Sequence, residues 1–155
     1  MKKKPLFSFW KILKYPPQLF YAIGLGPIYG RIVLLLTTTG RKSGLPRVTP
    51  LQYEEMDGKI VIGSARGTKA DWYRNIVADQ HVQVRVKSHC FDGIGEQVTD
   101  PKRIADFLEY RLSKHPRMIG FIMSREGISK NPSREELESH AKGKAMVIIR
   151  SAENG

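Results

Sequence analysis

The sequence predicts a mostly antiparallel small β-barrel with helices packed on it. The chain has 155 residues, of which 41% are hydrophobic and 26% charged, which suits one globular domain with a real core. About six strand-like runs occur, and tight turns join the successive runs. No strand–helix–strand rhythm is present, and Gly24-Leu25-Gly26 lacks the strand, spacing and acidic partner of a dinucleotide-binding motif. An antiparallel barrel is therefore favoured over a parallel Rossmann sheet.

Three strands are expected first. Residues 32–39 form an aliphatic and then threonine-rich run, which predicts a strand ending at the turn signal of residues 40–44. Residues 47–56 are expected to form a second strand. An Asp-Gly pair at 57–58 predicts a hairpin turn into a third strand over residues 59–64.

A helix and two further strands are expected next. Apolar residues at helical spacing, Trp72 and Ile76 among them, predict a helix over residues 70–79. Valines alternate with polar residues over 82–86, which is typical of a half-buried strand. Another strand is expected over residues 91–98.

The last part of the chain is expected to be mainly helical. Pro101 can open a helix at its first position, and the apolar face of that helix carries Ile104, Phe107, Leu108 and Leu112. Residues 118–123 are apolar and ambiguous. Residues 134–140 predict an exposed helix, and residues 145–149 a last buried strand.

Positive charge is concentrated near the N-terminus. The formal net charge is +11, and residues 1–53 contain nine Lys and Arg and no acidic residue. A basic region implies an anionic partner, which could be nucleic acid, a phospholipid surface, or a phosphorylated or polycarboxylated small molecule. Nucleic acid is disfavoured, because no recognition motif occurs and the cations gather in a turn and a tail.

We divide the chain into a basic amphipathic segment at 1–30, a barrel at 31–150 and a tail at 151–155. The first segment is too interrupted by charge, proline and glycine for a signal peptide or a membrane-spanning helix. Three lysines at 2–4 stand close to Phe7, Phe9 and Trp10, as in helices that lie on anionic lipid. The alternative, which we favour, is that these aromatic residues cover the core of the domain or of a dimer partner.

The sequence lacks residues for other common chemistries. Cys90 is the only cysteine, which excludes an intramolecular disulfide and suits a reducing, cytoplasmic compartment. The four histidines have no metal-ligand spacing, so no metal site is expected. His89 and Cys90 would point to opposite faces of a strand and could not form a nucleophile–base pair.

Residues 37–47 are the most informative stretch. They combine three cations, several hydroxyls and two glycines at the end of a strand. Glycines let backbone N–H groups converge on an anion, and arginine can bind a phosphate with two hydrogen bonds. The stretch therefore suits a phosphate, although a solvated basic hairpin turn fits the composition equally well. From the residues alone, Trp72 is interpreted as a core residue and Asn75 as a capping or solvent-facing one.

Three ordered motifs resemble the deazaflavin-dependent nitroreductase family. They are Leu-Thr-Thr-Thr-Gly-Arg-Lys-Ser-Gly-x-x-Arg-x-x-Pro-Leu at 36–51, Val-Ile-Gly-Ser-Ala-Arg-Gly at 61–67, and Trp-Tyr-x-Asn-Ile-x-Ala at 72–78 followed by Val82-x-Val84. The close match spans residues 33–87. The resemblance implies a split β-barrel, similar to FMN-binding barrels, that uses the reduced deazaflavin coenzyme F420.

The resemblance also implies a role for each matched position. The cations and Ser43 of the turn would hold the phosphate and anionic tail of the coenzyme. Ala65, Arg66 and Gly67 would line the deazaflavin ring through backbone groups, and Asn75 would approach it from the helix. The implied coenzyme-binding residues are Thr39, Arg41, Lys42, Ser43, Arg47, Ser64, Ala65, Arg66, Gly67, Trp72 and Asn75.

The implied function is hydride transfer from reduced F420 to a quinone, a nitroaromatic or another electron-poor unsaturated acceptor. Two alternatives stay open: a related split barrel that binds FMN, haem or a lipid without F420 activity, and a basic protein that binds a membrane surface or nucleic acid. The protein could be a monomer or a homodimer. It could be cytoplasmic, or lie peripherally on the inner face of the membrane. We expect the proton to come from water; Asn75, Tyr73 and Tyr110 are weak catalytic candidates.

Overall fold

The computed structural model describes residues 33–154 of the chain. The amphipathic segment expected at 1–30 lies outside these described residues. Within the described part, no helix is both long enough and apolar enough to span a lipid bilayer. The account below therefore concerns the barrel and its helices alone.

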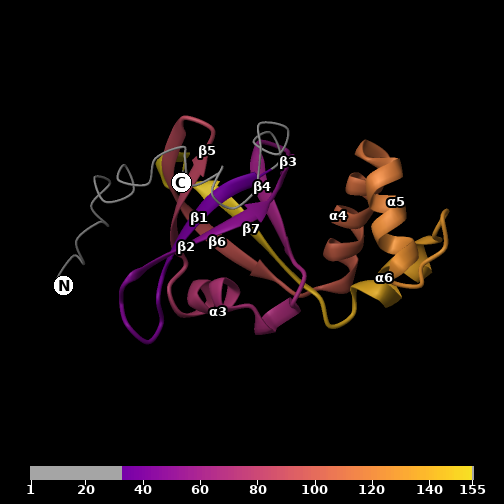
Figure 1. Cartoon of the computed structure of the whole chain (residues 1–155), viewed down its shortest axis with the longest axis horizontal. Helices are drawn as coiled ribbons and strands as arrows, with labels where there is room; N and C mark the ends of the chain where they lie inside the picture. The colour runs from indigo at the N-terminus through magenta and orange to yellow at the C-terminus, as the bar shows by residue number, and fades with distance from the viewer. Residues whose placement is uncertain (1–32, 155) are drawn as a thin grey trace. The chain divides into compact units, whose positions relative to one another are not determined.

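Seven strands form one sheet in which every neighbouring pair is antiparallel (Figure 1). The order across the sheet is β2-β1-β5-β6-β7-β4-β3. The strands are β1 (Val33–Thr39), β2 (Pro46–Gln52), β3 (Glu54–Met56), β4 (Lys59–Ser64), β5 (His81–Val86), β6 (His89–Val98) and β7 (Ala145–Ser151).

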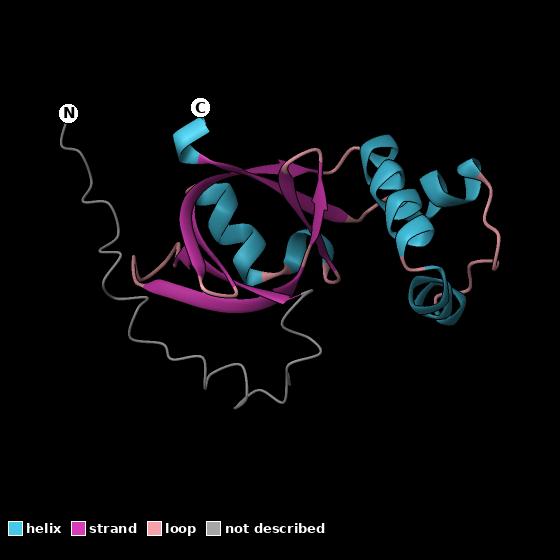
Figure 2. Ribbon diagram, turned by 90° about the horizontal axis from the view of Figure 1, so that it is seen from above, coloured by secondary structure: helices cyan, strands magenta, loops and turns pink. Residues whose placement is uncertain are grey.

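The sheet curls into a half-barrel (Figure 2), which confirms the split-barrel prediction. The single strand predicted over residues 47–56 is wrong, because it divides at Tyr53 into β2 and β3. β2 pairs with β1, whereas β3 pairs with β4 at the other end of the sheet order. The chain thus passes from one end of the sheet to the other at Tyr53, and seven strands result instead of six.

Alternating side chains give the sheet two apolar faces. Ile60 and Ile62 of β4 pack into the interior of the curled sheet. Val61 points to the outer face, where it packs against a second cluster that contains Ile104 and Phe107. Because the side chains of a strand alternate in direction, one strand supplies both cores.

One helix belongs to the barrel interior. The helix α3 (Asp71–Ala78) lies across one end of the curled sheet (Figure 2). Its Trp72, Tyr73 and Ile76 are buried in the same cluster as the inward residues of β1 and β4. The helical spacing seen in the sequence therefore marks the face that closes the barrel.

Three further helices, α4 (Pro101–Lys114), α5 (Pro116–Arg125) and α6 (Arg134–Ala141), pack together beside the sheet (Figure 1). Asp100 caps α4 by accepting a hydrogen bond from the N–H of Lys102. The ambiguous stretch at 118–123 is helical. The prediction of an exposed helix at 134–140 is wrong in part, because Leu137 is buried against α4 and α5.

Candidate functional site

The basic turn after β1 has a fixed backbone. Its two ends are joined by a hydrogen bond from the N–H of Gly40 to the carbonyl oxygen of Leu45, 2.7 Å long. A Cβ atom on Gly40 would lie 2.7 Å from the Ser43 Oγ and 3.1 Å from that carbonyl oxygen. Gly44 has a φ of +69°, which favours glycine. The glycines of the motif are thus required by the shape of the turn.

The side chain of Asn75 ties this turn to α3 and β1. Asn75 Oδ1 accepts hydrogen bonds from the backbone N–H of Arg41 (3.2 Å) and from its guanidinium (2.9 Å). Asn75 Nδ2 donates to Thr38 Oγ1 at 3.1 Å. Asn75 is only 4% exposed, so the reading of this residue as a cap or a solvent-facing residue is wrong. Its amide orients Arg41.

The cations of the turn differ in their partners. Arg41 forms an ion pair with Asp71 of α3 at 2.9 Å, and the hydrogen bond in this pair lowers the pKa of Asp71. The side chains of Lys42 and Arg47 are exposed and have no hydrogen bond or ion pair with any other residue that the structure describes. Arg47 lies opposite Thr38 in the β1–β2 ladder. Two cations beside the turn therefore remain available to an anion.

The loop after β4 is held by a buried hydroxyl. Ser64 Oγ donates to the carbonyl oxygen of Gly67 at 2.7 Å. Gly67 has a φ of +57°, and a Cβ there would lie 2.9 Å from the carbonyl oxygen of Gly143. Ala65 and Arg66 between them are exposed. The loop can thus present backbone groups and the Arg66 side chain to a ligand.

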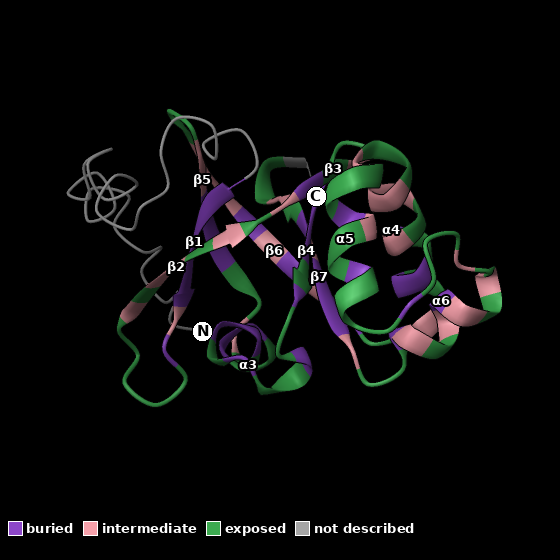
Figure 3. Ribbon diagram, turned by 45° about the vertical axis from the view of Figure 1, so that its right-hand side comes forward, coloured by how far each residue is buried: buried purple, intermediate pink, exposed green. Residues whose placement is uncertain are grey.

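A cleft of about 650 Å³ opens where the barrel is split. One side is formed by residues 49–54, the other by residues 63–66, and α4 and α5 form the outer wall. Figure 3 colours the strands and helices by burial, with buried residues purple and exposed ones green. The sequence-predicted residues that line the cleft are Ser64, Ala65, Arg66 and Trp72.

The remaining predicted site residues lie outside the cleft lining. Thr39, Arg41, Lys42, Ser43 and Arg47 belong to the turn, which reaches the rim of the cleft through the Arg41–Asp71 pair, since Asp71 lines the cleft. Asn75 and Gly67 support the turn and the loop from behind. The structure therefore brings the three sequence motifs to one side of the barrel.

The two tyrosine candidates, Tyr73 and Tyr110, lie away from the cleft. Tyr73 is buried in the barrel core, and burial raises the pKa of its hydroxyl. The Tyr110 hydroxyl donates to the carbonyl oxygen of Glu55 at 2.8 Å and accepts from Lys114 at 3.4 Å. Neither tyrosine lines the cleft.

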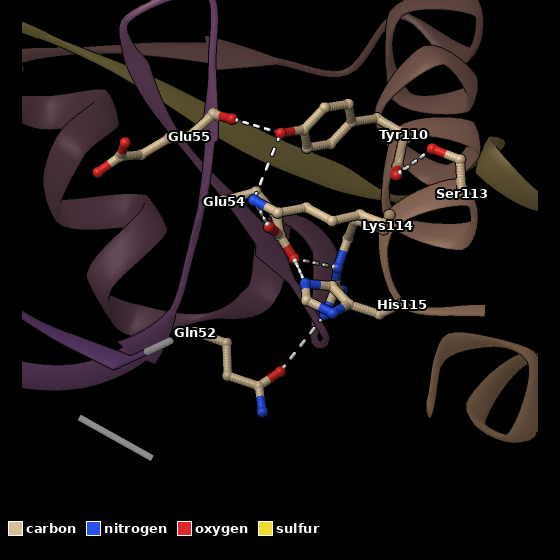
Figure 4. A network of polar contacts seen from close by, with 8 residues as sticks. Gln52, Glu54, Glu55, Tyr110, Ser113, Lys114 and His115 are labelled. Carbon is tan, nitrogen blue, oxygen red and sulfur yellow. Dashed lines mark hydrogen bonds and ion pairs between the residues drawn. The ribbon is translucent and has the colours of Figure 1, made fainter. Parts of the chain in front are cut away.

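The sequence analysis missed a buried ion cluster on the cleft wall (Figure 4). Glu54 of β3, whose side chain is 7% exposed, lies 3.3 Å from Lys114 Nζ and 3.3 Å from His115 Nε2. Its Oε1 is also 3.6 Å from Arg111 Nε. Arg111 and Lys114 lie in the last turn of α4 and His115 directly follows the helix, so their i, i+3 and i+4 spacing could have signalled the cluster.

No metal-binding site is present in the described part of the chain. Within residues 33–154, no group of three or more His, Cys, Asp and Glu side chains is arranged to hold a metal ion. A basic turn lies beside a largely apolar cleft, an arrangement that suits a phosphorylated ligand with a flat ring system.

Comparison with known families gives a match over more than half of the chain. Residues 23–117 match the family model described as F420H(2)-dependent quinone reductase. The matched range includes the turn, the loop after β4, α3 and the basic residues of α4.

Solved structures share the fold at low sequence identity. An F420-H2 dependent reductase (FDR-A) is 21% identical, with 76% of this chain and 94% of that chain covered and a TM-score of 0.51. A chain described as a domain-swapped dimer is 18% identical, with 87% and 100% covered and a TM-score of 0.52. A putative pyridoxamine 5'-phosphate oxidase from Listeria innocua is 13% identical, with 86% and 94% covered and a TM-score of 0.52.

Proposed function

Because this chain belongs to the F420H2-dependent quinone reductase family, it is an oxidoreductase that uses coenzyme F420, and we propose that its acceptor is a quinone. The FMN-, haem- and lipid-binding alternatives and the nucleic-acid alternative are not favoured by this family membership. A nitroaromatic compound is a second acceptor class that the same site could reduce, since it is also flat and electron-poor.

The observation that carries this proposal is the pair of cations, Lys42 and Arg47, whose side chains have no partner among the described residues and which stand beside a glycine-bounded turn. A phosphate needs hydrogen-bond donors and positive charge, and the side chains of Lys42, Ser43 and Arg47 provide both. We therefore propose that Lys42, Ser43 and Arg47 bind the phosphate and the anionic tail of F420. Arg41 would assist while Asn75 fixes its orientation.

The cleft is the proposed place for the ring and the acceptor. When bound, the reduced coenzyme supplies the hydride. The loop at 64–67 would contact the ring through its backbone, and Trp72 would provide an apolar surface for it. The apolar side chains of α4 and α5 exclude water from the acceptor, so the protein contributes mainly orientation and a dry environment.

The test is a pair of measurements on the purified full chain. Quenching of F420 fluorescence gives the affinity for the coenzyme, and stopped-flow oxidation of F420H2 by menadione gives the hydride-transfer rate. We expect F420 to bind and menadione to be reduced. Replacing Tyr73 or Tyr110 by phenylalanine should lower the rate only modestly; a loss of about a hundredfold would identify a dedicated proton donor instead.

Two finer properties remain proposals. Lipid contact is the less favoured of the two roles expected for the segment at 1–30, and we propose a test of it on the basis of the lysines and aromatic residues there. Deleting residues 1–14 should leave a folded barrel that sediments less with phosphatidylglycerol vesicles. A homodimer is the second proposal, tested by sedimentation equilibrium of the full chain.

A further inference from the structure

We propose that Arg111 binds the carbonyl oxygen of the acceptor and stabilises the negative charge that forms there during reduction. This inference rests on the proposed quinone reductase function and deepens it, because it assigns an anion-recognising group to the acceptor end of the cleft. The class of ligand it would bind is a quinone, or an aromatic enolate or phenolate of similar shape.

The first argument is the position of the guanidinium. Arg111 lines the cleft, and its side chain is 19% exposed. The guanidinium carbon lies 5.6 Å from the centre of the Phe107 ring, so an apolar residue supports the cation from α4. Burial lowers the pKa of Arg111, but an arginine stays charged at neutral pH.

The second argument is that the donors of Arg111 are largely unused. A guanidinium has five N–H donors. The Arg111 guanidinium makes one hydrogen bond to a described residue, a long one of 3.5 Å from Nη2 to Gln52 Oε1, while its buried Nε faces Glu54 Oε1 at 3.6 Å. The terminal Nη groups therefore keep donors that a ligand oxygen in the cleft could accept from, with the added strength of a charged donor.

The third argument is the charge around Glu54. Its carboxylate is shared by Arg111, Lys114 and His115, two of which are permanently charged. One negative charge therefore does not neutralise the cluster, whose contacts Figure 4 shows, and positive charge remains next to the part of the cleft that Glu54 and Arg111 line. Glu54 and its other partners hold Arg111 in place but leave some of its guanidinium N–H donors unused. Glu54 is therefore a positioning residue.

The fourth argument is the chemistry of quinone reduction. A hydride brings two electrons and one proton, so a neutral quinone becomes a hydroquinone monoanion, and a second proton from water completes the hydroquinone. The donor loses that hydride and one further proton to water, which balances the reaction. A guanidinium beside the oxygen binds the anion more tightly than the neutral quinone, and it therefore favours the transition state over the bound substrate.

The test compares two ligands that differ in charge. 2-Hydroxy-1,4-naphthoquinone is an anion at neutral pH, whereas menadione, its 2-methyl counterpart, is neutral. Each is titrated into the full chain without coenzyme, and binding is followed by tryptophan fluorescence in the Trp10→Phe variant, where Trp72, which lines the cleft, is the remaining tryptophan. We expect the wild-type protein to prefer the anion by about tenfold, as charge-assisted hydrogen bonds of this kind contribute.

Two variants assign the preference to Arg111. Arg111→Gln should abolish the preference, and Arg111→Lys, which keeps the charge but loses the planar donor pair, should keep part of it. The matched control is Arg103→Gln on the same helix, because Arg103 pairs with Glu96 and does not line the cleft. Arg103→Gln should leave the preference unchanged.

Several results would overturn the proposal. They are equal affinity of the wild-type protein for the two ligands, no binding of either ligand, or a preference that survives in Arg111→Gln. The wild-type comparison is decisive even if Arg111→Gln does not fold. F420 titration separates this proposal from the general one. If the wild-type protein binds F420 but does not prefer the anion, only the role of Arg111 is refuted, whereas absence of F420 binding refutes the oxidoreductase function.

Discussion

The basic turn after β1 and the ion cluster beside β3 use the same kinds of side chain in opposite ways. The turn draws its cations from positions close together in the sequence, leaves Lys42 and Arg47 exposed, and is shaped by its glycines. The cluster buries Glu54 and takes its bases from a helix that is 60 residues away at Lys114. Cations without a partner are available to a ligand, while cations that share a buried carboxylate first stabilise the fold.

The largest effect should come from removing the carboxylate of the cluster. Glu54→Gln leaves Arg111, Lys114 and His115 facing one another without compensation. Breaking a fully buried ion pair costs about 3–5 kcal/mol, and since Lys114 is half-exposed we expect about 2–3 kcal/mol of unfolding free energy to be lost. Urea denaturation measures this loss.

The neighbouring Glu55 is exposed and provides the control for that experiment. Glu55→Gln should change the unfolding free energy by less than about 0.5 kcal/mol. If the two variants are equally stable, the cluster does not stabilise the fold, and the contrast with the turn fails.

The second largest effect, on both stability and F420 affinity, should come from replacing Asn75, whose amide anchors the turn. Asn75→Ala removes the acceptor for Arg41 and the donor to Thr38, and it leaves buried groups unpaired. We expect a loss of about 1–3 kcal/mol in stability and about tenfold or more in F420 affinity. Asn75→Asp keeps the oxygen that Arg41 needs and should retain more affinity. Unchanged F420 binding in Asn75→Ala would show that the turn is not ordered by this amide.

The third largest effect should be on F420 affinity alone, without a change in stability. Arg47→Ala and Lys42→Ala remove cations without a partner in the described part of the chain, so stability should stay within about 0.5 kcal/mol of the wild type. F420 affinity should fall about tenfold in Arg47→Ala and decrease further as salt is added. Lys59→Ala, an exposed cation of β4, is the matched control. Equal F420 affinities in all three variants would contradict the assignment of the turn.

The smallest effect concerns pH. The hydrogen bond from Arg41 lowers the pKa of Asp71 below its ordinary value of 3.8. The folded state therefore binds fewer protons than the unfolded state in acid, and the pair contributes stability above pH 3.8 that is lost as the pH falls below it. We expect the small difference in melting temperature between wild type and Asp71→Asn to be present at pH 6 and to vanish below the lowered pKa.

The turn could be predicted from sequence because its information is local. Its glycines, hydroxyls and cations all lie within eleven residues. Apolar and polar residues alternate in a strand such as residues 82–86, which made that strand predictable. Trp72 and Asn75 were found through the motif, although the burial of Asn75 depends on Thr38 and Arg41, which only the fold brings together.

The ion cluster could not be predicted in the same way. Glu54 follows a run of 53 residues without an acid, and a surface position is the default for such a residue. Its burial follows from the break of the strand at Tyr53, which sends β3 to the far end of the sheet and against α4. A continuous strand over residues 47–56 would have kept Glu54 beside β1, away from its three bases.

Strand β2 stands at one end of the sheet order, and it contains Pro46 and Pro50. Proline has no N–H to donate. In the pairing of β2 with β1, the N–H groups of every second residue of β2 point to β1 and those of the residues between them point away from the sheet. Both prolines stand at the positions that point away. That outer edge consequently offers few donors to another strand. Such an edge is a poor template for pairing with a strand of another molecule, so the prolines act against edge-to-edge aggregation at this end of the sheet.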